Sequence, residues 1–401
     1  MNKRVLFVIP YLYEGGAQRA LSNIEMNFPD DWEIETLVNS EYKKAYPVKG
    51  IIHSLGISET PKTDSVLFQF RVFLKRINKL KELKNTGRYD ACISMADSAS
   101  VANILSGNKH CKTIISIRTS LKAMSRLAQY KYVVNPLARV FYNSADKVVA
   151  VSEELKKELI EEFKIKQDIV VAIPNGYNLE KILTKAKEPL EDDIKSFIDG
   201  KKVICNVGRL SFPKGQWHLI RSFKRIKAEI PEAVLMIAGI GELEEYLHKL
   251  TKELDLEESV RFLGHTDNVY KYLKSSDVFA FPSILEGFPN AMAEAVCIGL
   301  PCVATDFKTG AREILAPEIQ NDPMPIKEAR DCSYGILTPL CSDNMPSAIE
   351  ELEEQERMYA DAVISLLRDD NKMCHYREKS LERKKTLDIK NAVDKWVGLL
   401  F

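Results

Sequence analysis

Two carboxylates and two cations stand out as side chains that could do chemistry together. Glu286 and Glu294 are separated by seven residues, while Arg209 and Lys214 bracket a short loop before a helical pattern. A guanidinium binds phosphate as a bidentate fork and an ammonium binds it as a point charge. The free N–H groups at a helix N-terminus attract phosphate as well. The pattern predicts a diphosphate site on the cationic loop, and a crevice that both carboxylates face.

The segment 277–306 must position the carboxylates. An apolar run at 277–283 predicts a buried parallel strand, and a second strand is predicted at 301–305. Between them, residues 290–298 are good helix formers, with Pro289 suited to the first helical position and Gly299 to a left-handed helix stop. This order places the first carboxylate at the carboxyl end of a strand, where open α/β sheets bind ligands. The second lies about a turn and a half inside the helix.

Glycine turns follow other predicted strands. Val5 to Pro10 is an apolar run that leads to Gly15 and Gly16 and then to a helical pattern at 17–26. Such a glycine pair lets backbone N–H groups approach a ligand, although a tight turn without further role is the alternative. Strand-like segments recur at 34–38, 50–55, 89–95, 112–117, 146–151 and 168–173. Their alternation with helical patterns predicts parallel sheets covered by helices on both faces.

Three motifs carry a family resemblance. Glu286 and Glu294 enclose GFPN, a G-x-P-x-x-A-x-D tail follows at 299–306, and G-R-L followed by K-G spans 208–215. Together they resemble the signature of glycosyltransferase family 4, whose members are retaining nucleotide-sugar enzymes. The resemblance implies an α/β protein of the GT-B fold, with two doubly wound Rossmann-like domains facing a cleft. It predicts an amino-terminal domain at 1–178, a linker at 179–200, a nucleotide-sugar domain at 201–388 and a helix at 389–401 that crosses back.

The resemblance also implies roles for individual residues. Arg209 and Lys214 would stabilise the charge that grows on the departing diphosphate, with help from Gly16. The sugar hydroxyls would be bound by Glu286 and by the main chain of Gly287, Phe288, Pro289 and Asn290. Glu294 would bind the ribose hydroxyls, and the nucleobase and ribose would lie near Gly241, Leu263 and His265. Gly15 and Gly16 would bring the amino-terminal domain against the donor phosphates and the acceptor.

Arg118 differs from the family pattern. Many relatives have a histidine in the region after this predicted strand, where it meets the donor sugar or the acceptor, and this chain has none there. Arg118 is the candidate in its place, either as a catalytic residue that binds an anionic acceptor or as a residue that positions the loop.

The function that follows is retaining transfer of a sugar from a nucleotide-diphosphate donor, a UDP-sugar, to a glycan or lipid-linked acceptor in polysaccharide biosynthesis. No metal cofactor is expected, because two cations stand where Mg²⁺ would and the sequence contains no D-x-D. A GT-B nucleotide-sugar epimerase and a non-catalytic nucleotide-sugar-binding partner are the alternatives. Gly239 and Gly241 supply only two of the three glycines of a dinucleotide motif, which argues against an NAD enzyme.

Charge is unevenly distributed along this neutral chain of 401 residues. Residues 51–150 hold 16 Lys and Arg against 6 Asp and Glu, which suggests an anionic partner for one face. Within them, 64–84 is a basic amphipathic helical pattern, with a predicted packing stripe of Phe70, Phe73, Leu74, Ile77, Leu80 and Leu83. A surface helix docked on the sheet explains it, and an anionic membrane surface is the alternative partner. No nucleic-acid partner is expected.

The eight cysteines are scattered, without C-x-x-C or zinc spacing. We therefore expect reduced, mostly buried thiols in a reducing compartment. No apolar run reaches the ~18 residues of a membrane span, and the apolar start is too short for a signal peptide. The expected location is cytoplasmic, with peripheral attachment at the inner face of the membrane as an option.

Overall fold

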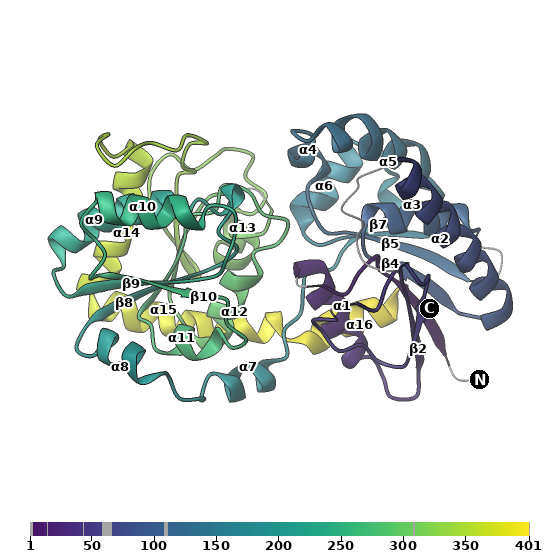
Figure 1. Cartoon of the computed structure of the whole chain (residues 1–401), viewed down its shortest axis with the longest axis horizontal. Helices are drawn as coiled ribbons and strands as arrows, with labels where there is room; N and C mark the ends of the chain where they lie inside the picture. Colours follow the sequence, from purple (N-terminus) through teal and green to yellow (C-terminus); the bar gives the residue numbers. More distant parts are fainter. Residues whose placement is uncertain are drawn as a thin grey trace. The chain divides into compact units, whose positions relative to one another are not determined.

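The computed structural model describes residues 3–13, 15–42, 44–57, 66–107, 111–307 and 309–400. The chain forms two compact units, unit 1 from Met1–Gly176 with Ile389–Phe401, and unit 2 from Tyr177–Asp388 (Figure 1). Each contains a sheet with helices on both faces, as the alternating pattern predicts. Within the described residues, no helix combines the length and apolar character needed to span a membrane.

The sheet of unit 1 is parallel and has the order β3-β2-β1-β4-β5-β6-β7. Its strands are β1 (Arg4–Val8), β2 (Glu33–Val38), β3 (Ile51–Ser54), β4 (Ala91–Ser94), β5 (Lys112–Ile117), β6 (Lys147–Ala150) and β7 (Val170–Ala172). Its helices are α1 (Gly16–Met26), α2 (Val66–Gly87), α3 (Asp97–Leu105), α4 (Leu121–Met124), α5 (Asn135–Phe141), α6 (Glu153–Glu161) and α16 (Ile389–Gly398), with a π-helix at Tyr130–Val134. All six strand-like segments predicted between 34 and 173 are confirmed.

The sheet of unit 2 has the order β10-β9-β8-β11-β12-β14-β13, and among its described strands β13 alone runs antiparallel to its neighbour. Its strands are β8 (Lys202–Val207), β9 (Ala233–Ala238), β10 (Val260–Gly264), β11 (Val278–Phe281), β12 (Cys302–Thr305), β13 (Arg330–Cys332) and β14 (Gly335–Thr338). Its helices are α7 (Leu179–Lys185), α8 (Asp192–Ile198), α9 (Gln216–Glu229), α10 (Glu244–Glu253), α11 (Tyr270–Lys274), α12 (Asn290–Ile298), α13 (Ala311–Leu315), α14 (Glu354–Arg368) and α15 (Asp370–Arg383).

Each unit has its own core. In unit 1, α1 and α16 pack on one face of the sheet, where Trp396 is fully buried, and α2 and α3 pack on the other (Figure 1). In unit 2, α9, α10 and α14 cover one face around the buried Trp217. The eight thiols are free and all except Cys374 are buried. The predicted buried, unpaired cysteines are therefore confirmed.

The predicted linker at 179–200 is wrong. The segment contains α7 and α8, and both belong to unit 2. Asn178 caps α7 by accepting a hydrogen bond from the backbone N–H of Lys181 at 2.9 Å, and Lys271 on α11 pairs with Glu191 at 2.6 Å. Local capping and this ion pair order a segment that had been expected to be a linker. The last segment, Ile389–Phe401, groups with unit 1.

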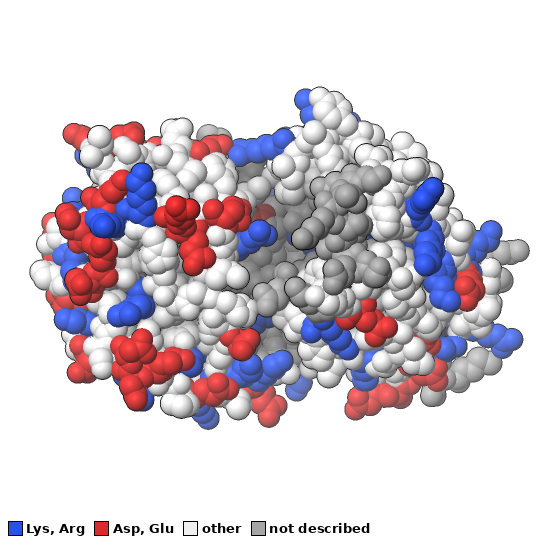
Figure 2. Space-filling view, in the orientation of Figure 1, with Lys and Arg blue, Asp and Glu red and all other residues white. Residues whose placement is uncertain are grey.

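The amphipathic helix forms, but its packed stripe differs from the prediction. The predicted start at Asp64 lies outside the described residues, and α2 is described from Val66 to Gly87. Val72, Leu80 and Leu83 are buried, whereas Phe70 and Leu74 are 55% and 44% exposed. Their placement on the packed stripe was therefore wrong. Figure 2 shows Lys and Arg atoms along the part of unit 1 where Figure 1 places α2.

Glu25 on α1 gives unit 1 a testable pH dependence. The side chain is fully buried, its Oε1 accepts a hydrogen bond from Thr36 Oγ1 at 2.8 Å, and its Oε2 has no partner among the described residues. Burial raises the pKa of Glu25 to about 8. Between the ordinary value of 4.5 and about 8, the unfolded chain releases this proton while the folded chain keeps it, so stability falls as pH rises.

We therefore expect Glu25→Gln to raise the Tm relative to the wild type at pH 8 but not at pH 5. Thermal melts of both proteins at the two pH values measure this, with Glu161→Gln on the exposed side of α6 as the control. An equal effect of Glu25→Gln at both pH values would contradict a buried, protonated carboxyl.

Candidate functional site

The loops that carry the predicted cations and the first predicted carboxylate lie at one edge of the unit 2 sheet. Strands β8 and β11 are neighbours, although the chain leaves β8 toward β9 on its other side. Arg209 and Lys214 follow β8, and Glu286 follows β11. Strand order reverses here, and the carboxyl ends of strands at such a switch point form the usual ligand crevice of a doubly wound sheet. The topology therefore brings the loop after β8 and the loop after β11 together at this edge of the sheet.

Lys214 and Glu286 form the centre of this site. Lys214 Nζ lies 2.6 Å from Glu286 Oε1, which also accepts a hydrogen bond from Ser283 Oγ at 2.8 Å. Lys214 lies 5.5 Å from the ring centroid of Phe281, and the Thr309 hydroxyl donates to the Glu286 carbonyl. The Lys214 side chain is 23% exposed, so its ammonium is held in place yet reachable. Such a preorganised cation stabilises developing negative charge with little rearrangement.

Arg209 is placed differently from Lys214. Its side chain is 74% exposed, and its guanidinium forms an ion pair with Glu242 Oε2 at 3.3 Å. The family resemblance implies the same role for both cations, which is to stabilise the departing diphosphate. In the structure, Lys214 is fixed by the crevice, whereas Arg209 is an exposed side chain paired with the turn before α10. Its predicted part in binding the diphosphate stays a prediction.

The glycines after β9 serve close backbone packing. Gly239 has φ 143°, and a Cβ built there would lie 2.0 Å from the Gly208 carbonyl oxygen. A Cβ on Gly241 would lie 2.2 Å from the Leu210 carbonyl oxygen. The absence of side chains lets this turn bond directly to the cationic loop, with Leu210 N donating to Ile240 O at 3.0 Å. Packing alone accounts for Gly241, and its predicted nucleotide contact stays a prediction.

The GFPN loop leads into α12, which has the predicted bounds. Pro289 is the N-cap and not the predicted first helical residue, and Gly299 ends the helix with φ 87° as predicted. Phe288 is buried, Gly287 is half-buried, and Asn290 Oδ1 accepts a hydrogen bond from the Tyr177 hydroxyl at 2.6 Å. The start of α12 is thereby fixed beside Glu286, which suits a loop expected to present main-chain groups to a sugar.

Glu294 lies deeper than the sequence suggested. It is 2% exposed, and its Oε1 accepts a hydrogen bond from the Tyr270 hydroxyl on α11 at 3.4 Å. Glu294 is therefore more deeply buried than Glu286, which is 9% exposed, and the expectation that both carboxylates face one crevice stays a prediction. Leu263 and His265 lie at the end of β10, where the His265 ring pairs with Asp267 at 3.6 Å. The roles of these three residues toward nucleotide stay predictions.

The remaining predicted residues lie at the carboxyl edge of the unit 1 sheet. Gly15 and Gly16 follow β1, and α1 begins at Gly16. Gly15 has extended backbone with φ 171°, so its conformation does not require glycine. Arg118 follows β5, where its guanidinium donates to the side chains of Asn175 and Ser116. These hydrogen bonds orient the guanidinium at the edge where a doubly wound sheet binds ligands.

Arg76 on α2 is a buried cation that the sequence analysis did not single out. It is 4% exposed, and burial lowers its pKa to about 10. Its guanidinium donates to Asn39 Oδ1 at 3.0 and 3.3 Å and to Ser98 Oγ at 3.2 Å. No carboxylate among the described residues pairs with it. Arg76 lies four residues after Val72 and four residues before Leu80, and this spacing indicates that it lies on the packed side of α2.

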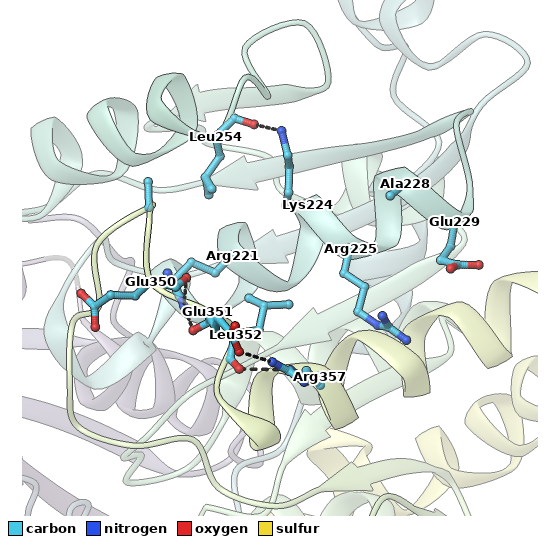
Figure 3. A pocket seen from close by; sticks show the side chains of 11 residues that line it. Arg221, Lys224, Arg225, Ala228, Glu229, Leu254, Glu350, Glu351, Leu352 and Arg357 are labelled. Atoms are coloured by element: carbon cyan, nitrogen blue, oxygen red, sulfur yellow. Dashed lines mark hydrogen bonds and ion pairs between the residues drawn. The ribbon is translucent and has the colours of Figure 1, made fainter.

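A separate cavity of about 450 Å³ lies elsewhere in unit 2, between α9, the segment 348–352 and the start of α14 (Figure 3). Its cations already have partners: Lys224 bonds the Leu254 carbonyl, Arg221 bonds the carbonyls of Glu350 and Glu351, and Arg357 pairs with Glu351 at 3.0 Å (Figure 3). Because these cations already bind protein groups, we interpret the cavity as a gap in the packing between α9 and the segment 348–352. The crevice at β8 and β11 is the candidate site.

Comparison with known proteins identifies the family of this chain. The sequence model of Glycosyltransferase Family 4 matches residues 15–181, and that of Glycosyl transferases group 1 matches residues 188–322. An uncharacterized glycosyltransferase of Methanocaldococcus jannaschii is 32% identical over 390 residues, covering 92% of this chain and 95% of that protein. A Campylobacter jejuni protein is 28% identical over 399 residues, covering 98% of each chain. It is named N-acetylgalactosamine-N,N'-diacetylbacillosaminyl-diphospho-undecaprenol 4-alpha-N-acetylgalactosaminyltransferase.

The fold has solved counterparts. HepE of Anabaena, in a complex with UDP, superposes with a TM-score of 0.73 at 18% identity, and the match covers 99% of both chains. A likeness at this identity concerns the fold, which is GT-B. With two family models matched in succession and a relative aligned over nearly the whole length, the chain belongs to glycosyltransferase family 4.

Proposed function

We propose that this glycosyltransferase moves a sugar from UDP to a lipid-linked glycan with retention of anomeric configuration, in polysaccharide biosynthesis. The observation that carries the proposal is the Lys214–Glu286 pair at the switch point of the unit 2 sheet. Among the similar proteins, HepE was crystallised with UDP, and the Campylobacter relative is named for an alpha linkage and a diphospho-undecaprenol acceptor. An alpha product from an alpha-linked nucleotide sugar means retention.

The proposed reaction breaks the bond between the anomeric carbon and the β-phosphate oxygen and forms a bond from that carbon to an acceptor hydroxyl oxygen. The acceptor proton leaves on the released diphosphate. Negative charge grows on the β-phosphate as the first bond breaks, and Lys214 is positioned to stabilise it. Glu286 is engaged by Lys214 and Ser283, which suits a group that orients sugar hydroxyls. We assign it no nucleophilic role.

We also propose that the reaction needs no metal ion. The support is the fixed ammonium of Lys214, a charge that the chain itself supplies at the place where a divalent cation would neutralise phosphate. Transfer assayed after EDTA treatment, with and without added Mg²⁺, tests this. Loss of transfer with EDTA and its return with Mg²⁺ would overturn the metal-independent part of the proposal.

The function itself is tested with a panel of UDP-sugars. The true donor should raise the Tm by mass action, because it binds the native state. UDP should then be released only when a lipid-diphosphate saccharide is added, and NMR of the product should show the donor's anomeric configuration. UDP-sugar conversion without acceptor would indicate an epimerase, and binding without any turnover would indicate a non-catalytic partner.

The two glutamates should separate in their effects. We expect Glu294→Gln to weaken UDP binding by about tenfold or more, whereas Glu286→Gln leaves UDP affinity nearly unchanged and lowers kcat. The reason is that Glu286 is proposed to meet the sugar, which UDP lacks, and Glu294 the ribose. Isothermal titration with UDP alone, followed by turnover measurements, tests the assignment. Equal losses of UDP affinity in both variants would contradict it.

A further inference from the structure

Helix α2 has an apolar stripe that faces away from its own unit. Its packed side includes Leu80 and Leu83, which lie in the core beneath α2 and α3. A second set of large apolar side chains at the start of the helix is exposed: Val66, Leu67, Phe70 and Leu74. Spacings of three and four residues place Leu67, Phe70 and Leu74 on one side of the helix. An ordinary surface helix exposes polar residues there.

A second exposed apolar group lies in the same layer of helices. The segment 121–141, which contains α4, the π-helix and α5, exposes Leu127, Tyr132, Val133 and Val140. Helix α3 contacts both α2 and α5, and Figure 1 shows the three helices along the same side of the sheet. The exposed apolar residues of α2 and of 121–141 therefore lie in one layer of helices on unit 1, and we call the outer side of this layer the α2–α5 face.

Cations accompany these apolar residues and acids are nearly absent. Arg71, Lys75 and Lys81 are exposed on α2, and Glu82 is the one acid between residues 66 and 87. No Asp or Glu occurs between residues 98 and 145, whereas 121–141 contributes four Lys and Arg. Basic atoms over α2 are visible in Figure 2. Exposed apolar side chains interleaved with cations are typical of elements that lie in the interface of an anionic bilayer.

We propose that the α2–α5 face docks on the surface of an anionic lipid bilayer. The proposal rests on the proposed function, because docking would bring unit 1 to the membrane that holds a lipid-diphosphate acceptor. A dissolved polyanion would engage the cations but would give Phe70 and Leu74 no apolar environment. A second copy of the chain would bring like charges together at this face. A bilayer accommodates both features, since its headgroups take the cations and its acyl boundary takes the apolar side chains.

Vesicle co-sedimentation tests the proposal with full-length protein. The wild type should bind phosphatidylglycerol-containing vesicles at low salt, bind phosphatidylcholine vesicles much less, and dissociate as salt rises. Replacing Arg71, Lys75 and Lys81 by Gln should lower binding by about fivefold per cation, or on the order of a hundredfold together. Phe70→Ser with Leu74→Ser should lower it with the cations intact. The matched control replaces three exposed unit 2 lysines by Gln: Lys249, Lys252 and Lys274.

The outcomes separate the possible occupants. Wild-type protein that stays in the supernatant at low salt overturns the proposal. Binding to dextran sulfate and vesicles alike, with no effect of the Phe70 and Leu74 replacements, assigns the face to dissolved polyanions and overturns it. Concentration-dependent dimers that the same replacements abolish assign it to self-association and overturn it as well. In every variant, UDP should stabilise the protein as in the wild type, so vesicle binding and the proposed transfer can fail separately.

Discussion

We expect Lys214→Met to lower kcat by about 100- to 1,000-fold, the loss typical of removing one preorganised electrostatic contact. Lys214 Nζ is fixed 2.6 Å from Glu286 Oε1 and 5.5 Å from the centroid of the Phe281 ring, so its removal deletes a charge that is already positioned. Because the charge on the diphosphate grows as the sugar bond breaks, the loss should appear in kcat more than in KM. Steady-state kinetics with the natural donor measure this.

Arg209→Met is the matched control for Lys214→Met. Arg209 belongs to the same loop but is 74% exposed and pairs with Glu242, so its charge is largely screened by water. We expect a loss of at most about tenfold. Arg209→Met should leave the melting temperature near that of the wild type, whereas Lys214→Met should lower it, because it leaves the buried Glu286 without its cation. Equal losses for the two cations would contradict the distinction that the structure makes between them, and no loss for Lys214→Met would remove it from the mechanism.

Much of the site could be predicted from sequence because its parts are local. Apolar runs predicted the strands, and Gly299 predicted the end of α12. The spacing of Arg209 and Lys214 predicted the cationic loop, and all of these elements have nearly the predicted bounds. The pairing of Lys214 with Glu286 depends on the adjacency of β8 and β11, which no local pattern encodes. The depth of Glu294 depends likewise on α11, whose Tyr270 packs against it. These contacts come from tertiary structure.

Helix α2 shows the limit of a pattern argument. Its apolar residues make two stripes, and periodicity alone does not tell which of them packs on the sheet. The cations were equally ambiguous: Arg76 and Lys84 are buried, and the Lys84 ammonium donates to the carbonyls of Asn103 and Gly107 at 2.8 and 2.7 Å. Long basic side chains reach buried acceptors while their stems pack as apolar groups. A basic amphipathic pattern therefore does not distinguish the exposed cations of α2 from the two buried ones that hold the helix in place.

The second large effect concerns a buried ion pair that holds α9 to α14. Arg221 Nε donates to both carboxylate oxygens of Glu356 at 2.9 and 3.2 Å, and both side chains are buried. Glu356 also contacts His218 Nδ1 at 2.8 Å and accepts a hydrogen bond from Glu353 N at 2.9 Å. We expect Arg221→Met to destabilise unit 2 by about 3–5 kcal/mol, because it leaves Glu356 buried without its cation.

Arg225 on the same helix provides the control. It pairs with Asp361 at 2.8 Å but is exposed, so Arg225→Met should cost less than about 1 kcal/mol. Hydrogen exchange of α9 and α14 amides reports unit 2 without interference from unit 1. A loss for Arg221→Met no larger than for Arg225→Met would contradict the prediction.

The Arg221→Met deficit should also depend on pH. Burial acts to raise the pKa of Glu356, yet hydrogen bonds involving His218 and Arg221 outweigh it and hold the pKa below the ordinary carboxyl value of 4.5. A depressed carboxyl pKa stabilises the fold at pH above that value, and the contribution is lost as pH falls through the folded pKa. In Arg221→Met, protonation relieves the uncompensated charge. The loss of unfolding free energy in Arg221→Met should therefore be full at pH 7 and shrink as the pH is lowered through 4.5. A pure packing defect would give the same loss at pH 7 and below pH 4.5.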